Sequence, residues 1–224
     1  MSLETIEFVR NPEPRCPVVL VLDTSASMTG NPINSLNEGV LAFKEEVQKD
    51  EKASLRVEVA IITFGESVRV AQNFVTIDQF EPHRLGVSGS TPMGGAIEKA
   101  IELVENRKQT YKSNGVSYYR PWVFLITDGE PTDGDRWRVA SQHIRQAEAD
   151  RRLSFFIVGV QGANMEKLSQ IASPNTPPLK LDGLKFREFF LWLSSSVQKV
   201  SESQPGQDQM IRLAPVSGWA QTTI

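Results

Sequence analysis

The sequence of 224 residues is poor in the residue types that build disulfides and zinc sites. It has one cysteine, Cys16, so a disulfide within the chain is excluded. Because Cys16 adjoins an apolar run, we expect a small buried side chain rather than a reactive thiol. The two histidines, His83 and His143, are isolated and match no metal-ligand spacing. A site made of soft ligands is therefore not expected.

Positive charge and long apolar runs are also scarce. Lys and Arg number 24 against 27 Asp and Glu, and no long basic run occurs. Since phosphate contacts dominate nucleic-acid affinity, we expect no nucleic-acid partner. Apolar runs such as residues 18–22 are far shorter than the ~20 residues of a membrane helix, and no basic stretch followed by an apolar run opens the sequence. We expect a cytoplasmic protein that does not bind membranes.

Strand and helix patterns alternate along the chain. Valine-rich runs without alternation predict strands buried on both faces, and apolar residues at helical spacing predict amphipathic helices. This order predicts an α/β fold with a mostly parallel central sheet and helices on both faces. The short turn at residues 65–67 predicts a hairpin, hence one antiparallel strand toward an edge. Strands are predicted at 16–22, 55–64, 68–77, 122–127, 154–160 and a short edge strand ending near 181, and helices at about 32–50, 92–108, 135–152, 164–172 and 184–201.

Composition divides the chain into three parts. Residues 1–15 are polar and contain prolines, which favours an N-terminal arm or an edge strand. Residues 16–202 carry the alternating pattern and form the predicted domain. Residues 203–224 are predicted to be a C-terminal linker and tail, because the segment begins rich in Gln, Ser, Pro and Gly. The tail contains Trp219, which would pack back on the domain or contact a partner.

Three polar segments fall where the carboxyl ends of strands are expected. Asp23, Ser25 and Ser27 follow the first strand, Thr91 precedes the long middle helix, and Asp128 follows the strand at 122–127. Ligands of open α/β sheets bind outside these strand ends. Alternate residues of an extended loop point the same way, so the first three side chains can converge. A set of hard oxygen donors predicts a site for Mg²⁺, with Mn²⁺ or Ca²⁺ as alternatives.

The ligand types also suggest how such an ion would be used. Hydroxyl groups are neutral, so a divalent cation would remain short of negative charge if the two carboxylates act through water. It would then bind one more anionic ligand, which a Glu or Asp of another protein could supply. The N-terminus of the helix after Thr91 adds positive potential.

Other interpretations of these residues are open at this stage. Ser, Thr and Asp at strand ends often serve only turns and helix caps. An Asp after a first strand also marks haloacid-dehalogenase nucleophiles and receiver phosphoacceptors. The former need a second Asp where Ser25 stands, and the latter need a Lys near Gln161. A metal-dependent hydrolase or phosphotransfer enzyme is the main functional alternative, although no nucleophile or general base is evident.

The residues after Asp128 allow two interpretations each. Glu130, Asp133 and Asp135 would tune the metal site, or form a solvated loop in which Asp133 or Asp135 caps the next helix. Trp137 would be an exposed partner contact near the metal, or part of the core. If the metal site has no binding role, the Trp137 face or the C-terminal tail would bind the partner instead.

The five candidate ligands resemble the metal-ion-dependent adhesion site of von Willebrand factor type A domains. The similarity covers roughly residues 16–200, and it implies a Rossmann-like fold without enzymatic activity. It also implies that Ser25 and Ser27 bind the ion directly, Thr91 directly or through water, and Asp23 and Asp128 mainly through water. The open position would take a partner's carboxylate. The flanking sequences that carry the resemblance are VVLVL at 18–22, VAIITF at 59–64, GSTPM at 89–93 and FLITDG at 124–129.

Within that family the chain is most similar to the TerY-type proteins of bacterial tellurium-resistance and stress operons. This resemblance implies a scaffold in a complex with a kinase and a phosphatase. Some relatives have a Cys-rich metal-binding extension, which is absent here because the tail has no cysteine. The supporting sequences are RCPVVL at 15–20, LNEG at 36–39, YRPWV at 119–123, EPTD at 130–133 and FFLWLS at 189–194.

Overall fold

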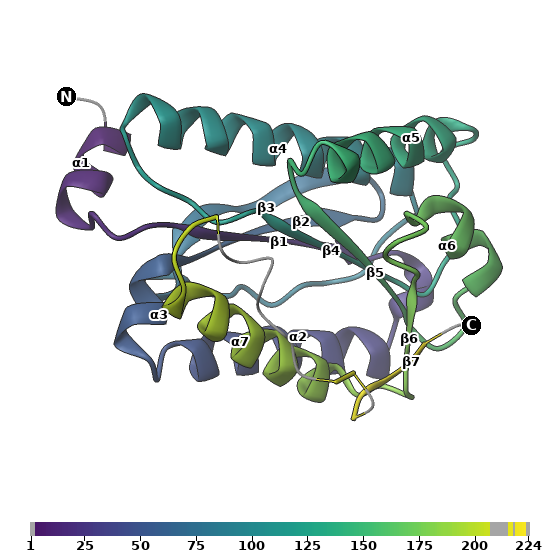
Figure 1. Cartoon of the computed structure of the whole chain (residues 1–224). Helices are drawn as coiled ribbons and strands as arrows, with labels where there is room; N and C mark the ends of the chain where they lie inside the picture. The colour runs from purple at the N-terminus through teal and green to yellow at the C-terminus, as the bar shows by residue number, and fades with distance from the viewer. Residues whose placement is uncertain (1–2, 207–214, 217, 223–224) are drawn as a thin grey trace.

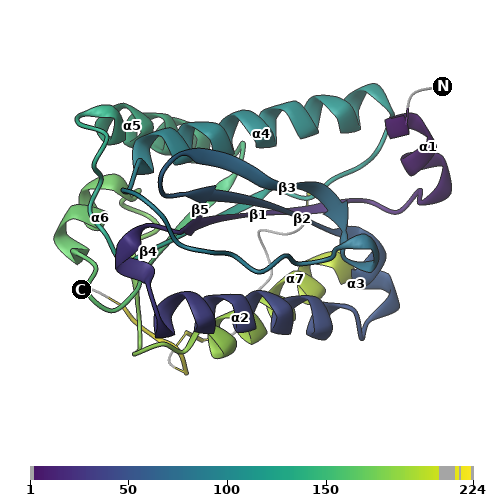
Figure 2. The same cartoon turned by 180° about the vertical axis from the view of Figure 1, so that it is seen from behind.

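The computed structural model describes residues 3–206, 215–216 and 218–222, which build a seven-stranded sheet between two layers of helices (Figures 1 and 2). The strand order is β3-β2-β1-β4-β5-β6-β7. Five strands run parallel, while β3 pairs antiparallel with β2 and β7 pairs antiparallel with β6. The strands are β1 (Cys16–Asp23), β2 (Val57–Phe64), β3 (Val68–Thr76), β4 (Trp122–Thr127), β5 (Ser154–Gly159), β6 (Leu179–Leu181) and β7 (Ala220–Thr222).

The predicted sheet is confirmed, with one addition at its edge. The mostly parallel strands and the antiparallel β3 agree with the prediction. The predicted edge strand, β6, is instead covered by β7, which the C-terminal tail supplies. The reason is packing: Trp219, only 2% exposed, lies against the rings of Phe189 and Trp192. The described part of the tail therefore packs back on the domain.

Both faces of the sheet are buried because a layer of helices covers each of them, as the side chains of β1 show. Val18, Leu20 and Leu22 point into the core under one helix layer, and Val19 and Val21 point into the core under the other. This explains the absence of a polar alternation in the strand sequences. One layer contains α2 (Asn31–Val47), α3 (Glu51–Arg56) and α7 (Phe186–Glu202), and the other contains α4 (Met93–Ser113), α5 (Arg136–Ala149) and α6 (Met165–Ile171).

Three helix predictions were incomplete or wrong. The N-terminal arm contains a helix, α1 (Leu3–Arg10), rather than an edge strand. Residues 51–56 form α3, which begins where the Asp50 side chain accepts a hydrogen bond from the backbone N–H of Ala53. Helix α4 continues to Ser113 instead of ending near residue 108, because Tyr111 is fully buried and holds the last turn against the sheet.

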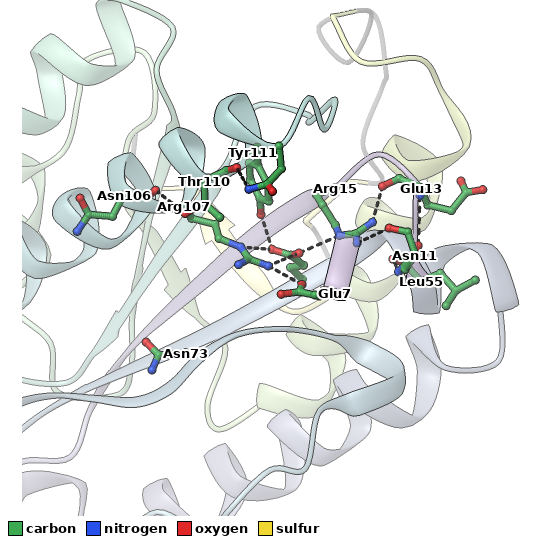
Figure 3. A network of polar contacts seen from close by, with 12 residues as sticks. Glu7, Asn11, Glu13, Arg15, Leu55, Asn73, Asn106, Arg107, Thr110 and Tyr111 are labelled. Carbon is green, nitrogen blue, oxygen red and sulfur yellow. Dashed lines mark hydrogen bonds and ion pairs between the residues drawn. The ribbon is translucent and has the colours of Figure 1, made fainter. Parts of the chain in front are cut away.

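A buried polar network fixes α1 and α4 to the amino ends of the central strands (Figure 3). The Glu58 carboxylate accepts hydrogen bonds from Arg15, Arg107 and the Tyr111 hydroxyl, and Arg107 also pairs with Glu7 of α1. Arg15 and Glu58 are completely buried. Burial and the neighbouring Glu58 charge raise the pKa of Tyr111 well above its usual value of 10. Removing one member of this network would leave a buried charge without its partner, which is strongly destabilising.

Candidate metal centre

The carboxyl ends of β1 and β4 bring two of the predicted ligand segments together. The strands are parallel neighbours, with Leu22 opposite Ile126, so the loops after them start side by side. The Ser27 hydroxyl donates to Asp128 Oδ1 at 2.7 Å, and the Ser25 and Ser27 hydroxyl oxygens are 2.9 Å apart. Two hydroxyls and a carboxylate thus form one continuous set of oxygens.

Asp23 lies at the buried base of this set. Its two carboxylate oxygens accept from the Ser25 backbone N–H at 2.8 Å and from the Thr127 hydroxyl at 2.5 Å. Burial raises the pKa of Asp23, the bonds from Ser25 and Thr127 lower it, and the charge of Asp128 raises it further. No cationic side chain is bonded to Asp23 among the described residues. A divalent cation fits this group, because it would supply the missing positive charge.

Thr91 approaches the same point from the loop before α4. A methyl group on Gly129 would lie 3.1 Å from Thr91 Oγ1 and 3.6 Å from Asp23 Oδ2, so both oxygens border the space that glycine leaves open. Two hydrogen bonds join the Thr91 backbone to Thr132. The Thr91 N–H donates to the Thr132 hydroxyl, and the Thr91 carbonyl accepts from the Thr132 N–H. The fold therefore brings all five predicted side chains to one place.

Two residues that support the site were missed in the sequence, and a third was expected to cap a different helix. Thr127 and Thr132 hold Asp23 and Thr91 through their hydroxyls. The third is Asp133, whose Oδ2 accepts from the Gly95 N–H at 2.9 Å and so caps the preceding helix, α4, rather than the next one. Pro92, at the N-cap of α4, offers no such oxygen. Only the folded structure, which places the two loops side by side, reveals these contacts, because 38 residues separate Asp133 from Gly95.

The remaining acidic residues and Trp137 lie in the surrounding wall. Asp135 pairs with Arg138 at 2.8 Å, and Glu130 accepts from the Asn164 amide. Trp137 is 7% exposed and packs in the core between α4 and α5, so of its two interpretations the core position is confirmed and the exposed partner contact is excluded. The two helices approach closely at this residue: a Cβ on Gly94 would lie 2.5 Å from the Trp137 backbone nitrogen.

A groove of about 460 Å³ runs beside the metal loop. It is bounded by Thr24, whose carbonyl accepts from the Ser88 N–H, and by the β2–β3 hairpin. The exposed side chains of Arg69 and Arg84 line it; each makes a hydrogen bond to a neutral oxygen, and neither forms an ion pair within the described residues. Exposed Glu66 is the acidic residue of its lining. The groove therefore presents cations next to the candidate ion site.

Two other features are absent from the described residues: a cluster of charged or soft metal ligands, and a membrane-spanning helix. Nowhere in residues 3–206, 215–216 and 218–222 do three His, Cys, Asp or Glu side chains gather as a metal site. An ion bound here would thus depend on hydroxyl oxygens as well as the two carboxylates. Among the same residues, none of the helices has both the length and the apolar character needed to cross a bilayer.

Comparison with known proteins identifies the family. The model of the von Willebrand factor type A domain matches residues 18–185. The inter-alpha-trypsin inhibitor heavy chain H4 of Homo sapiens is 26% identical over 161 residues, which cover 68% of this chain and 17% of that protein. The chain thus spans about a sixth of that relative's length.

Two solved structures share the fold. The vWF domain of the pilus tip protein Mfa5 from Porphyromonas gingivalis has a TM-score of 0.60 at 10% identity, covering 91% of this chain and 98% of that one. Manganese-loaded TRAP protein from Plasmodium vivax has a TM-score of 0.53 at 17% identity, covering 79% and 73%. The sheet order, the helix layers and the matched residues together lead to one conclusion: this chain belongs to the von Willebrand factor type A domain family.

Proposed function

We propose that this domain binds a protein partner through a divalent cation, Mg²⁺ in the first instance and Mn²⁺ or Ca²⁺ as alternatives. The observation that carries the proposal is the convergence of five oxygen-bearing side chains of which only two are charged. Ser25 and Ser27 would bind the ion directly, Thr91 directly or through water, and Asp23 and Asp128 mainly through water. These hard oxygen donors suit such ions. A Glu or Asp of the partner would complete the coordination.

The groove beside the site supports an acidic partner segment. A peptide whose carboxylate reaches the ion would continue past Thr24 toward Arg69 and Arg84, which have no carboxylate of their own within the described residues. Charge pairs of this kind raise the association rate and favour acidic partners over basic ones. The cation and the groove would thus recognise successive parts of one segment.

The cellular context that we propose is a bacterial tellurite-resistance or stress-response complex, in which this chain acts as a cytoplasmic scaffold for a kinase and a phosphatase. It rests on the sequence resemblance to TerY-type proteins, including YRPWV at 119–123 and FFLWLS at 189–194. In the fold these sequences build the start of β4 and the aromatic face of α7. They would therefore stabilise the domain, and the candidate ion site would contact the partner.

The test is a pull-down from the native host, with partners identified by mass spectrometry. Capture should require Mg²⁺, should be lost in EDTA and should be lost with Ser25→Ala. Ser113→Ala is the matched control: it removes the same kind of hydroxyl, but Ser113 is exposed in the last turn of α4, and its hydroxyl donates to the Thr110 carbonyl. Partner capture that survives both EDTA and Ser25→Ala would contradict the metal-bridged mechanism.

The alternative is a metal-dependent hydrolase or phosphotransfer enzyme that uses the same cation to polarise a substrate. Phosphatase and nuclease assays with Mg²⁺ or Mn²⁺ discriminate between the two. Reproducible turnover that Ser25→Ala abolishes and Ser113→Ala retains would replace the binding proposal with this one.

A further inference from the structure

A second pocket, of about 490 Å³, lies at the end of the sheet opposite the candidate metal centre. Pro121 directly precedes β4 and Arg152 lies two residues before β5, so the pocket borders the amino ends of these strands. The metal loops follow the carboxyl ends. The pocket therefore lies at the amino ends of the parallel strands, and the candidate metal centre lies at their carboxyl ends. The side chains that define the pocket are Lys108, Lys112, Tyr118, Arg120, Arg151 and Arg152.

Five of these six side chains are cationic, although the whole chain carries a net charge of -3. One carboxylate, Glu105, lines the pocket, and it already pairs with Lys108 at 3.0 Å and Arg152 at 3.1 Å. The side chains of Lys112, Arg120 and Arg151 make no hydrogen bond or ion pair with any other residue in the described part of the chain. Three unpaired positive charges thus face the pocket, and its one carboxylate is already shared by two other cations.

Helix ends explain part of this cluster. Lys112 lies in the last turn of α4, and Arg151 and Arg152 follow the end of α5, where cations offset the exposed carbonyl groups. Arg120, however, belongs to neither helix: it is half-buried in the segment before β4. The residue before it, Tyr119, is fully buried, and its N–H donates to the carbonyl of Arg15 in the buried network.

The backbone at Arg151 is the independent observation that points to a ligand. Its φ of 55° is left-handed, and it is the one non-glycine residue with positive φ that the described residues contain. The Arg151 N–H donates to the Glu148 carbonyl and the Arg152 N–H to the Ala147 carbonyl, which is the helix ending that favours glycine at this position. Retaining arginine there costs stability, and strained residues of this kind gather at functional sites.

We propose that this pocket binds a small, multiply charged phosphate anion. Guanidinium groups match phosphate oxygens with two parallel hydrogen bonds, and Lys112 adds a point charge. Arg120 and Arg151 approach from two different segments, so a compact anion between them would be held from two sides. The site is separate from the candidate ion site, and its occupancy does not depend on the proposed function.

Calorimetric titration of the full chain with inorganic triphosphate, in buffer free of divalent cations because triphosphate chelates them, tests the proposal. Saturable binding of one triphosphate is expected. Arg120→Ala and Lys112→Ala should each weaken it about tenfold, the scale of one charged hydrogen bond. Arg151→Gly is the sharpest variant. It should weaken binding as strongly while leaving the melting temperature unchanged or raised, since glycine suits this backbone.

The matched control is Arg187→Ala, which removes the same charge. Arg187 is exposed in the first turn of α7. This helix follows β6, so it starts near the carboxyl ends of the strands, away from the pocket. Affinity should be unchanged in this variant and in Ser25→Ala. Absent or unsaturable binding, or equal weakening by Arg187→Ala, would overturn the proposal. So would binding of a single-stranded oligonucleotide through the same three cations without binding of triphosphate.

Discussion

The Ser27 hydroxyl donates a hydrogen bond to Asp128 Oδ1 at 2.7 Å, although 101 residues separate the two in the chain. This bond joins the loop after β1 to the loop after β4. It exists because parallel neighbours end at the same edge of the sheet. A metal ion bound there would have ligands from both loops, so its binding would be linked to the pairing of the two strands.

Mg²⁺ should therefore stabilise the folded domain, and the effect should depend on Asp128. At a free ion concentration of 100 times Kd, the gain in unfolding free energy is about 2.7 kcal/mol. Asp128→Ala should abolish the Mg²⁺-dependent rise in melting temperature. Asp135→Ala, which removes an exposed carboxylate from the same loop, should retain it. An equal rise in the wild type and Asp128→Ala would argue against Asp128 as part of the site.

Glu58→Gln should be strongly destabilising. It removes the charge shared by Arg15 and Arg107, and Arg15 is completely buried. Loss of one partner from a buried ion pair costs about 3–5 kcal/mol, because the other charge remains uncompensated. Urea denaturation measures the change. The control is Glu46→Gln, which breaks an exposed pair with Lys49 and should cost less than about 1 kcal/mol.

Tyr111 should make the domain less stable at alkaline pH. Burial and Glu58 raise its pKa in the folded state, whereas in the unfolded state it ionises near pH 10. Above that pH the unfolded chain binds fewer protons than the folded chain, so this contribution is complete below about pH 10 and is lost as the pH rises. Urea midpoints at about pH 9 and 11 should fall less steeply for Tyr111→Phe than for the wild type. A parallel fall in both proteins would show that Tyr111 titrates normally.

Replacement by alanine should lower the unfolding free energy much more at Gly94 than at Gly95, although the two residues are adjacent in α4. A Cβ at Gly94 would meet the α5 backbone, 2.5 Å from the nitrogen of Trp137, whereas a Cβ at Gly95 would first meet the flexible Arg136 side chain at 3.2 Å. We expect Gly94→Ala to cost about 1–3 kcal/mol through overpacking. Gly95→Ala should be close to neutral, since alanine has the better helix propensity. Thermal unfolding distinguishes them, and equal costs would contradict the close helix contact.

Local patterns in the sequence were sufficient for the elements whose burial is uniform. The strand at 122–127 was predicted at its observed bounds, because a strand buried on both faces is apolar throughout. The end of α4 was missed because its last turn is polar apart from Tyr111. The buried Tyr111 hydroxyl is satisfied by donating a hydrogen bond to Glu58, which is distant in the sequence. Helix α1 was missed for the same reason: Glu7 meets its partner Arg107 across 100 residues.

The sequence by itself determined the α/β class, the order of the central elements and the five oxygen-bearing side chains at strand ends, because these depend on apolar periodicity and on the position of polar residues after strands. Only the tertiary structure decided which of those side chains meet, that Thr127 and Thr132 hold two of them, that Asp133 caps α4, and that Trp137 is buried. It also gathered Lys112, Arg120 and Arg151 into one pocket, although the sequence contains no basic run. These relationships depend on strand register and helix contacts between residues far apart in the chain, which a local pattern does not encode.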